Sequence, residues 1–265
     1  MALKSLKYNL EQRYQKLVGN YSASLLEAKS DWQKKELYHG RVLLSDGYVQ
    51  SMPVAERFRL LRTRIERRNS VGRDERVIAV SSAVPAEGKS LVAVNLARAF
   101  ATDQTGKTLL IDCDLRKPSV EKYFSLGEVP GLTDALLARI SLGSFAIPVS
   151  RGLDVITAGK AVEDPVKIFD DPGFNKELTV LKNKYNYIVL DCPPVLLCPE
   201  PGKLNMLADG MLMVVRGWRT ERHLLKDAVD IIGKTKIIGA VINDGTDAAR
   251  QYRYYRYYGQ NTQNN

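Results

Sequence analysis

The sequence predicts a three-layer α/β fold in which a mostly parallel central sheet is flanked by helices. Three observations predict it. From residue 76 onward, short β-rich apolar runs are separated by segments with helical periodicity. The runs are almost continuously apolar, as expected of parallel strands that are covered on both faces. Strands and helices alternate along the chain, and such alternation specifies right-handed crossovers.

The composition agrees with a globular α/β protein. The 265 residues are 45% apolar and 26% charged, which excludes a disulfide-stapled mini-protein, a disordered chain and a fibre. Lys and Arg outnumber Asp and Glu by 39 to 30, giving a formal charge of +9. This charge fits an anionic partner, whether nucleotide, nucleic acid or acidic membrane face, and fits a basic solvated surface equally well.

The N-terminal part is expected to be helical. Apolar residues recur at helical spacing within residues 4–38, which predicts an amphipathic helix broken near Gly19. This extension, residues 1–50, is expected either to pack against the main domain or to dock to a partner or an anionic bilayer. A second, very basic helix is predicted at residues 55–68.

The main domain is expected to span residues 51–248. Strands are predicted at residues 77–82, 108–112, 153–157, 187–191, 211–216 and 236–243. Helices are predicted between them at residues 90–102, 132–140, 174–185 and 221–233. The remaining residues, 249–265, are rich in Tyr, Arg, Asn and Gln and have no aliphatic side chain from Arg250 onward, so a flexible Tyr-rich tail is expected.

The cysteines and histidines exclude a zinc framework. Cys113, Cys192 and Cys198 form no C-x-x-C pair, and the chain has two histidines. Free thiols indicate a reducing compartment, and no apolar run approaches the length that spans a bilayer. We therefore expect a cytoplasmic protein.

The first strand of the domain leads into Ala83-Val-Pro-Ala-Glu-Gly-Lys-Ser90 and then directly into a helix. Strand, tight loop, Gly-Lys-Ser and helix are the context of a phosphate-binding loop, although Ala83 replaces its usual first glycine. Backbone N–H groups and the helix N-terminus favour phosphate, a lysine neutralises it and a serine hydroxyl ligates Mg²⁺. The predicted nucleotide-binding residues are Glu87, Gly88, Lys89, Ser90 and Leu91.

Three aspartates follow predicted strands. Asp112 and Asp114 end one strand and Asp191 ends another. Ligands of parallel sheets bind at the carboxyl ends of the strands, so the three carboxylates are expected to converge on one metal–phosphate centre. A single aspartate in such a place is more often a helix cap, but three beside a phosphate loop favour the metal interpretation. The chain has no G-x-G-x-x-G, which disfavours a dinucleotide-binding oxidoreductase.

With these residues the sequence resembles the bacterial tyrosine kinases, which belong to the MinD/ParA-like branch of the P-loop NTPase fold. The resemblance covers residues 56–258. It rests on Ala-Glu-Gly-Lys-Ser90, Leu-Ile-Asp-Cys-Asp-Leu-Arg-Lys-Pro118, Pro130-Gly-Leu-Thr-Asp-Ala-Leu-Leu, Asp191-Cys-Pro-Pro-Val, Gly239-Ala-Val-Ile-Asn243 and the tyrosine-rich tail.

The resemblance implies ATP and Mg²⁺ as cofactors. Lys89 and Ser90 would hold the triphosphate and the metal, and Asp114 and Asp191 would act on the metal and its waters. Asp112 would be the base that orients or deprotonates the acceptor tyrosine.

Two further binding roles follow from the resemblance. Arg116 would neutralise developing charge, and Asn243 would contact the adenine; the alternative for Asn243 is a turn residue at a strand end.

Two further parts of the resemblance concern assembly. Glu56, Arg59 and Arg62 match the E-x-x-R-x-x-R motif through which family subunits pack into a ring; a solvated basic helix is the alternative. The tail supplies acceptor tyrosines that can reach a neighbouring subunit, namely Tyr252, Tyr254, Tyr255, Tyr257 and Tyr258. Each phosphate would add roughly −1.5 to −2 charges, enough for a few to reverse the sign of the tail.

The implied function is autophosphorylation in trans that regulates exopolysaccharide or capsule biosynthesis and export. The implied partners are a membrane polysaccharide co-polymerase as activator, which would recruit the protein to the inner face of the membrane, and a tyrosine phosphatase. A MinD-like ATPase switch without kinase activity and a nucleic-acid-binding Arg/Tyr tail remain alternatives. Ala86 stands where the family frequently has glycine, and Glu200 where it usually has aspartate.

Overall fold

The computed structural model describes residues 42–43, 49–50, 52–102 and 106–243. The chain divides into two units, residues 1–52 and 53–265. In the first unit, β1 (Val42–Leu43) pairs antiparallel with β2 (Val49–Gln50). The helix predicted within residues 4–38 and the tail predicted from residue 249 lie outside the described residues.

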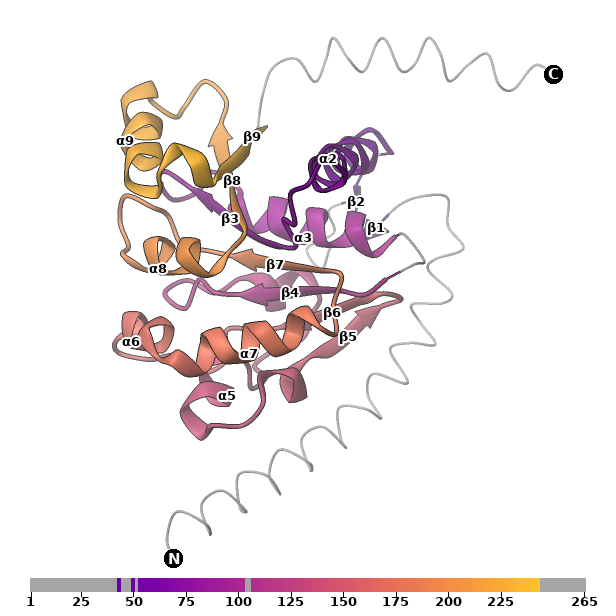
Figure 1. The fold of residues 1–265 in the computed structure, drawn as a ribbon, viewed down its shortest axis with the longest axis vertical. Helices are drawn as coiled ribbons and strands as arrows, with labels where there is room; N and C mark the ends of the chain where they lie inside the picture. Colours follow the sequence, from indigo (N-terminus) through magenta and orange to yellow (C-terminus); the bar gives the residue numbers. More distant parts are fainter. Residues whose placement is uncertain (1–41, 44–48, 51, 103–105, 244–265) are drawn as a thin grey trace, which may run out of the picture. The chain divides into compact units, whose positions relative to one another are not determined.

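The second unit is built on a seven-stranded sheet in its described part (Figure 1). In spatial order the strands are β5 (Ile147–Ser150), β6 (Leu153–Ile156), β4 (Thr108–Asp112), β7 (Tyr187–Asp191), β3 (Val77–Ser82), β8 (Gly210–Arg216) and β9 (Ile237–Asn243). β5 pairs antiparallel with β6, and every other neighbouring pair is parallel. The mostly parallel sheet predicted from the sequence is thereby confirmed.

The six predicted strands are all present, and those at residues 77–82, 108–112 and 187–191 begin and end where predicted. These three are buried on both faces along almost their whole length, which is why their sequences are continuously apolar. β5 was not predicted. It lies at the edge of the sheet and its residues alternate between half-buried and exposed, so it lacks the continuous apolar run of the other strands.

The predicted helices correspond to α2 (Met52–Ser70), α3 (Lys89–Ala101), α5 (Leu132–Ala138), α7 (Pro172–Lys182) and α9 (Arg222–Ile232). Three shorter helices were not predicted: α4 (Val120–Tyr123), α6 (Pro165–Asp170) and α8 (Glu200–Leu207). Each is eight residues long or less, too short for an apolar periodicity to register. None of the described helices has both the length and the apolarity needed to cross a membrane.

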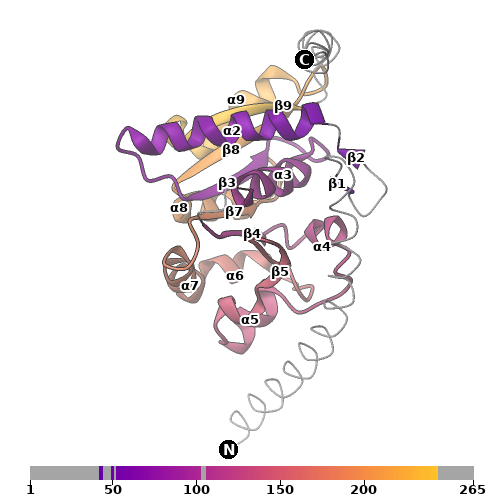
Figure 2. The same ribbon diagram turned by 90° about the vertical axis from the view of Figure 1, so that its right-hand side faces the viewer.

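The helices cover both faces of the sheet. α3 packs against β3, β4 and β7, and Ile65 of α2 joins the same buried cluster. α8 contacts β3, α6 and α9, and α6 also contacts α7. Figures 1 and 2 show α2 and α3 on one side of the sheet and α8 and α9 on the other. The described part therefore has the three layers that the sequence predicts.

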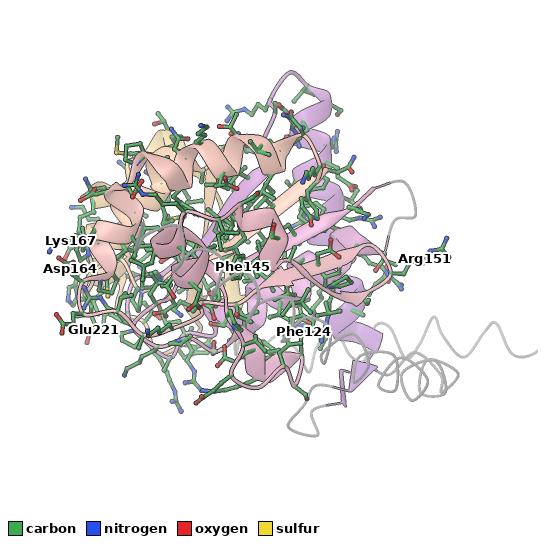
Figure 3. All side chains as sticks on the ribbon, turned by 90° about the horizontal axis from the view of Figure 1, so that it is seen from below. Phe124, Phe145, Arg151, Asp164, Lys167 and Glu221 are labelled. Carbon is green, nitrogen blue, oxygen red and sulfur yellow. The ribbon has the colours of Figure 1, made fainter. Side chains whose placement is uncertain are left out.

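Side chains fill the space between these layers (Figure 3). Phe145 is buried, while Asp164 and Lys167 form an ion pair of 3.3 Å at the rim. The carboxyl ends of the central strands β3, β4 and β7 lie side by side, because Val80 and Asp112 are both register partners of Asp191. This edge of the sheet is where an open parallel sheet binds its ligands.

Candidate active site

The phosphate loop connects β3 to α3. Ser82 Oγ donates a hydrogen bond of 2.7 Å to the carbonyl of Val84, and α3 begins at Lys89. Ala86 and Gly88 both have positive φ, 63° and 91°. Left-handed residues between right-handed ones turn successive N–H groups toward one concavity, which is the backbone arrangement that binds phosphate. The positive φ of Ala86 is a conformation that glycine adopts at lower cost than alanine.

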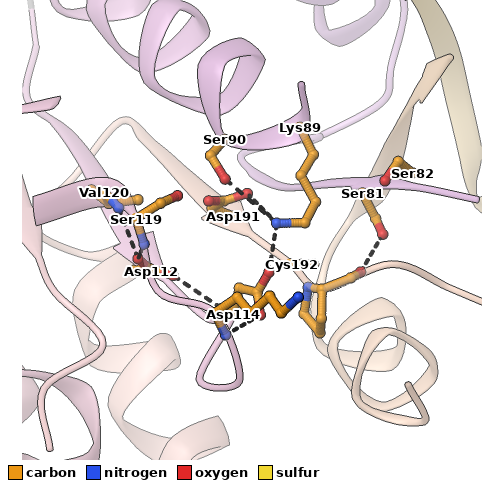
Figure 4. A network of polar contacts seen from close by, with 12 residues as sticks. Ser81, Ser82, Lys89, Ser90, Asp112, Asp114, Ser119, Val120, Asp191 and Cys192 are labelled. Atoms are coloured by element: carbon orange, nitrogen blue, oxygen red, sulfur yellow. Dashed lines mark hydrogen bonds and ion pairs between the residues drawn. The ribbon is translucent and has the colours of Figure 1, made fainter. Parts of the chain in front are cut away.

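Lys89 lies at the centre of the acidic residues (Figure 4). Its Nζ is 2.5 Å from Oδ2 of Asp114, 4.0 Å from Oδ1 of Asp191 and 3.4 Å from Oγ of Ser90. Burial acts to lower the pKa of Lys89, but the charges of Asp191 and Asp114 outweigh it, so the pKa is raised above its ordinary value. Lys89 is therefore a permanent cation at neutral pH.

The three aspartates predicted to converge do lie together, and all are buried. Asp112 and Asp191 are register partners on the parallel strands β4 and β7. Asp114 follows two residues after Asp112. Its Oδ1, the oxygen that does not contact Lys89, accepts a hydrogen bond of 3.0 Å from the N–H of Lys117. Three carboxylates thus lie next to the start of α3 with one lysine among them.

Asp191 is the carboxylate best suited to a cation. Both of its Oδ atoms are buried and neither has a hydrogen bond of good geometry, although the Ser90 hydroxyl and the Lys89 ammonium, 4.0 Å from Oδ1, lie beside them. Burial raises the pKa of Asp191 to about 6, against the opposing effect of the Lys89 charge. A buried carboxylate with so few donors is costly, and a bound magnesium ion would reduce this cost.

The donor set fits Mg²⁺ rather than a transition metal. Among the described residues, no group of three or more His, Cys, Asp or Glu side chains is arranged to hold a metal by itself. Mg²⁺ usually takes one or two carboxylates, and substrate phosphates and waters complete its shell. The unpartnered oxygens of Asp191 beside the hydroxyl of Ser90 match this pattern.

Asp112 is held by the backbone. Its Oδ1 accepts a hydrogen bond from the N–H of Asp114, and its Oδ2 accepts from those of Ser119 and Val120, each at 3.0 Å. Burial and the charge of Asp191 raise the pKa of Asp112 well above its ordinary value, while the three N–H donors act to lower it. Asp112 thereby ties β4 to the N-terminus of α4, a contact that its position in the sequence did not reveal.

Arg116 and Glu200 form a pair that the sequence also did not reveal. Nε of Arg116 donates a hydrogen bond of 2.8 Å to Oε1 of Glu200. The Glu200 side chain is 1% exposed and its Oε2 has no partner, whereas the Arg116 side chain is 45% exposed. The positive charge of Arg116 is thus partly neutralised by Glu200.

The remaining predicted nucleotide-binding residues lie in the phosphate loop or next to it. Asn243, at the end of β9, donates a hydrogen bond of 3.0 Å from Nδ2 to the carbonyl of Glu87. A Cβ on Gly88 would overlap the same side-chain amide, so glycine is required there by space as well as by φ. Leu91, half-buried in the first turn of α3, accepts a hydrogen bond at its carbonyl from Asn95.

The residues predicted at the subunit interface lie on α2. Nη1 of Arg59 is 3.0 Å from Oε2 of Glu56, and both side chains are about half exposed. Arg62 is turned toward its own domain: its Nη1 donates to the carbonyl of Ala99 in α3 at 3.0 Å, and its Nε is 3.4 Å from Glu66. The five tail tyrosines lie outside the described residues.

Comparison with known proteins identifies the family. No family model matches the chain. The chain is 35% identical over 193 residues to the tyrosine-protein kinase YwqD of Bacillus subtilis, covering 71% of this chain and 80% of that protein. It is 29% identical over 200 residues to the succinoglycan biosynthesis transport protein ExoP of Rhizobium meliloti, covering 69% of this chain and 25% of that protein.

Solved structures agree. The crystal structure of the chimerical protein CapA2B2 matches with a TM-score of 0.68 and 28% identity, over 74% of this chain and 86% of that one. The parallel sheet, the phosphate loop and the match to YwqD over 80% of its length all support one family assignment. The chain belongs to the bacterial tyrosine-protein kinases.

Proposed function

We propose that this kinase transfers the γ-phosphoryl group of ATP to the tyrosines of its own C-terminal tail, between neighbouring subunits. The observation that supports this best is Lys89 at the N-terminus of α3, with Asp114 at 2.5 Å and Asp191 at 4.0 Å from its Nζ. A lysine and a helix N-terminus attract the phosphates, and the acids beyond them suit a metal and an incoming hydroxyl.

The binding roles follow from these contacts. The backbone of residues 86–89 and the ammonium of Lys89 would hold the β and γ phosphates, for which Lys89 exchanges part of its contact with Asp114. Ser90 and Asp191 would ligate Mg²⁺, with Asp114 acting on its waters. Bound Mg²⁺ would neutralise charge on the β and γ phosphates.

The chemical step is an in-line displacement. The tyrosine oxygen forms a bond to the γ-phosphorus, the bond from that phosphorus to the β–γ bridging oxygen breaks, and ADP leaves with its electron pair. The phenol proton goes to a carboxylate, for which Asp112 is our candidate. Arg116 would stabilise the charge that develops, and releasing Glu200 would free its guanidinium to do so.

The acceptors are the tail tyrosines Tyr252, Tyr254, Tyr255, Tyr257 and Tyr258. A neighbouring subunit would present them within a ring built through Glu56 and Arg59 on α2, whose side chains are exposed. The similarity to ExoP supports a role in polysaccharide biosynthesis or export at the membrane. A membrane co-polymerase would be the activator and a tyrosine phosphatase would reset the tail.

Mass spectrometry of the purified chain after incubation with ATP and Mg²⁺ tests this function. We expect phosphotyrosine on the tail, and none in Lys89→Met. Transfer between subunits is tested by mixing Lys89→Met with an active chain whose five tail tyrosines are phenylalanine. Label on the Lys89→Met tail is the expected result.

The same reactions distinguish the kinase from a nucleotide-dependent switch, and transfer between subunits from transfer within one subunit. ATP hydrolysis with an unmodified tail, in the presence of the membrane activator, would contradict the kinase proposal and favour a nucleotide-dependent switch. Label confined to an active chain with intact tyrosines, with none passing to Lys89→Met, would contradict transfer between subunits.

A further inference from the structure

The side chain of Glu87, in the phosphate loop, is buried and bonded to groups of two separate segments. It is 2% exposed. Its Oε2 accepts a hydrogen bond of 3.2 Å from the N–H of Val84, and its Oε1 accepts from the N–H of Arg216 at 3.3 Å and from the hydroxyl of Thr220. We call this set, Glu87 with Val84, Arg216 and Thr220, the Glu87 clasp.

The Glu87 clasp joins two segments that are remote in the sequence. Val84 and Glu87 belong to the phosphate loop, and Arg216 and Thr220 bracket the loop between β8 and α9. The hydroxyl of Thr220 also lies 3.0 Å from the N–H of Arg216, which donates to it. The loop after β8 is therefore fixed at both ends against the phosphate loop.

Two other contacts run between the same segments. Nη1 of Arg216 lies 3.4 Å from the carbonyl of Ala86. The N–H of Gly217 donates a hydrogen bond of 2.6 Å to the carbonyl of Asn243, whose side chain in turn donates to the carbonyl of Glu87. The phosphate loop is thus held from β8 and β9 as well as from its own helix.

Each of the two loops contains a non-glycine residue in the left-handed backbone conformation. Ala86 and Trp218 have φ of 63° and 64°, and neither is glycine. A left-handed conformation costs about 1–2 kcal/mol for such a residue, so it persists where the surroundings enforce it. The Glu87 clasp lies beside both residues and supplies such enforcement.

The negative charge of the Glu87 carboxylate disfavours direct contact of this side chain with the phosphates. A carboxylate facing the β and γ phosphates would repel them, and the repulsion is strong where water is excluded. Two N–H groups and a hydroxyl donate hydrogen bonds to the carboxylate and so occupy both of its oxygens. The carboxylate therefore acts on the loop backbone and leaves the concavity to the N–H groups.

We infer that Glu87 and Thr220 are positioning residues for nucleotide binding, which hold the phosphate loop in its binding conformation through the Glu87 clasp. The inference rests on the proposed nucleotide role of the loop. Loss of one hydrogen bond to a charged group would shift the equilibrium between binding and non-binding conformations of the phosphate loop about tenfold. We therefore expect nucleotide affinity to depend on the hydroxyl of Thr220, a residue that lies outside the phosphate loop.

Matched variants of Thr220 test the inference. Thr220→Val keeps the shape and removes the hydroxyl, and Thr220→Ser keeps the hydroxyl. Titration of the full chain with mant-ADP and Mg²⁺ should give a Kd about tenfold higher for Thr220→Val and within twofold of the natural protein for Thr220→Ser. Thr179→Val is the control, because the hydroxyl of exposed Thr179 bonds its own helix at the carbonyl of Asn175.

A second variant probes the partner side chain. Glu87→Gln should also weaken mant-ADP binding, and combining it with Thr220→Val should weaken binding by less than the product of the two single effects, because both remove one contact. Urea unfolding without nucleotide measures whether each variant is folded. A lower unfolding free energy with an unchanged Kd for the folded protein would show a merely structural contact and overturn the inference.

Lys89→Met distinguishes failure of the positioning inference from failure of the proposed nucleotide site. If Lys89→Met loses mant-ADP binding while Thr220→Val binds as the natural protein does, the Glu87 clasp has no positioning role although the nucleotide site stands. If Lys89→Met binds with unchanged affinity, the proposed nucleotide site itself is wrong.

Discussion

Arg116 Nε lies 2.8 Å from Oε1 of Glu200, and the acid is almost completely buried whereas the arginine is half exposed. Loss of Arg116 should therefore destabilise the fold more than loss of Glu200. Water can solvate Arg116 when Glu200 is removed, but Glu200 without Arg116 would be a buried charge whose second oxygen already lacks a partner.

We expect Arg116→Gln to lower the free energy of unfolding by about 1–2 kcal/mol, a value discounted for the exposure of Arg116. Glu200→Gln should cost less, and the double variant should regain part of the loss from Arg116→Gln. Urea unfolding of the three variants measures this cycle. Additive losses would show that the pair does not interact in solution.

The hydrogen bonds of Asp112 lead to a second prediction. Asn offers one acceptor oxygen where three N–H groups now donate to the carboxylate. We expect Asp112→Asn to lower the free energy of unfolding by about 2 kcal/mol, because at least one N–H is left without an acceptor. It should also lower tyrosine phosphorylation.

Urea unfolding and the initial rate of tail phosphorylation check the two effects separately. Asp230→Asn, on the exposed part of α9, is the control and should change neither. Lost phosphorylation with unchanged stability would show that Asp112 acts as a base alone and that its backbone contacts contribute little.

The sequence predicts the parts of the fold that depend on local composition. β3, β4 and β7 are buried on both faces, so their apolar runs alone mark their limits. The parallel register then places Asp112 next to Asp191, and Asp114 follows two residues after the end of β4. A pattern of glycine and lysine before a helix predicts the phosphate loop for the same local reason.

Contacts across the chain were not predictable from local patterns. Glu200 pairs with a residue 84 positions away, and Thr220 reaches one 133 positions away. The direction of Arg62 toward α3 depends on how α2 packs, which the three-residue spacing of Glu56, Arg59 and Arg62 does not determine. Such partners follow from topology and side-chain packing.

The buried carboxylate of Asp191 predicts a conflict between stability and activity. Its oxygens are fully buried and neither accepts a hydrogen bond of good geometry, so its charge is costly in the nucleotide-free protein. We expect Asp191→Asn to raise the free energy of unfolding at pH 8 by about 1–2 kcal/mol and to abolish tail phosphorylation.

Urea unfolding with and without Mg²⁺ and ADP measures this. The nucleotide should stabilise the natural protein and have much less effect on Asp191→Asn, because ligand binding adds to stability in proportion to its affinity. Equal stabilisation of both proteins would contradict a metal-binding role for Asp191. Removing Mg²⁺ with EDTA should bring the natural protein down to its nucleotide-free stability.

The Arg68–Glu75 pair predicts a dependence on pH. Nε and Nη2 of Arg68 donate hydrogen bonds of 2.8 Å to the two oxygens of Glu75, linking the end of α2 to the start of β3. These bonds hold the pKa of Glu75 below its ordinary value of 4.5. A carboxyl whose pKa is lower in the folded state contributes stability above its unfolded pKa, and loses it as the pH falls through the folded value.

We expect Glu75→Gln to lower the free energy of unfolding by about 1 kcal/mol at pH 7, because Arg68 is a third exposed and partly screened. The difference between the natural protein and Glu75→Gln should stay constant from pH 7 to pH 5 and shrink as the pH falls below about 4.5. Urea unfolding across this range measures it, with exposed Glu163→Gln as the control. A difference that persists undiminished to pH 3 would show that the lost stability comes from packing and not from the charge of Glu75.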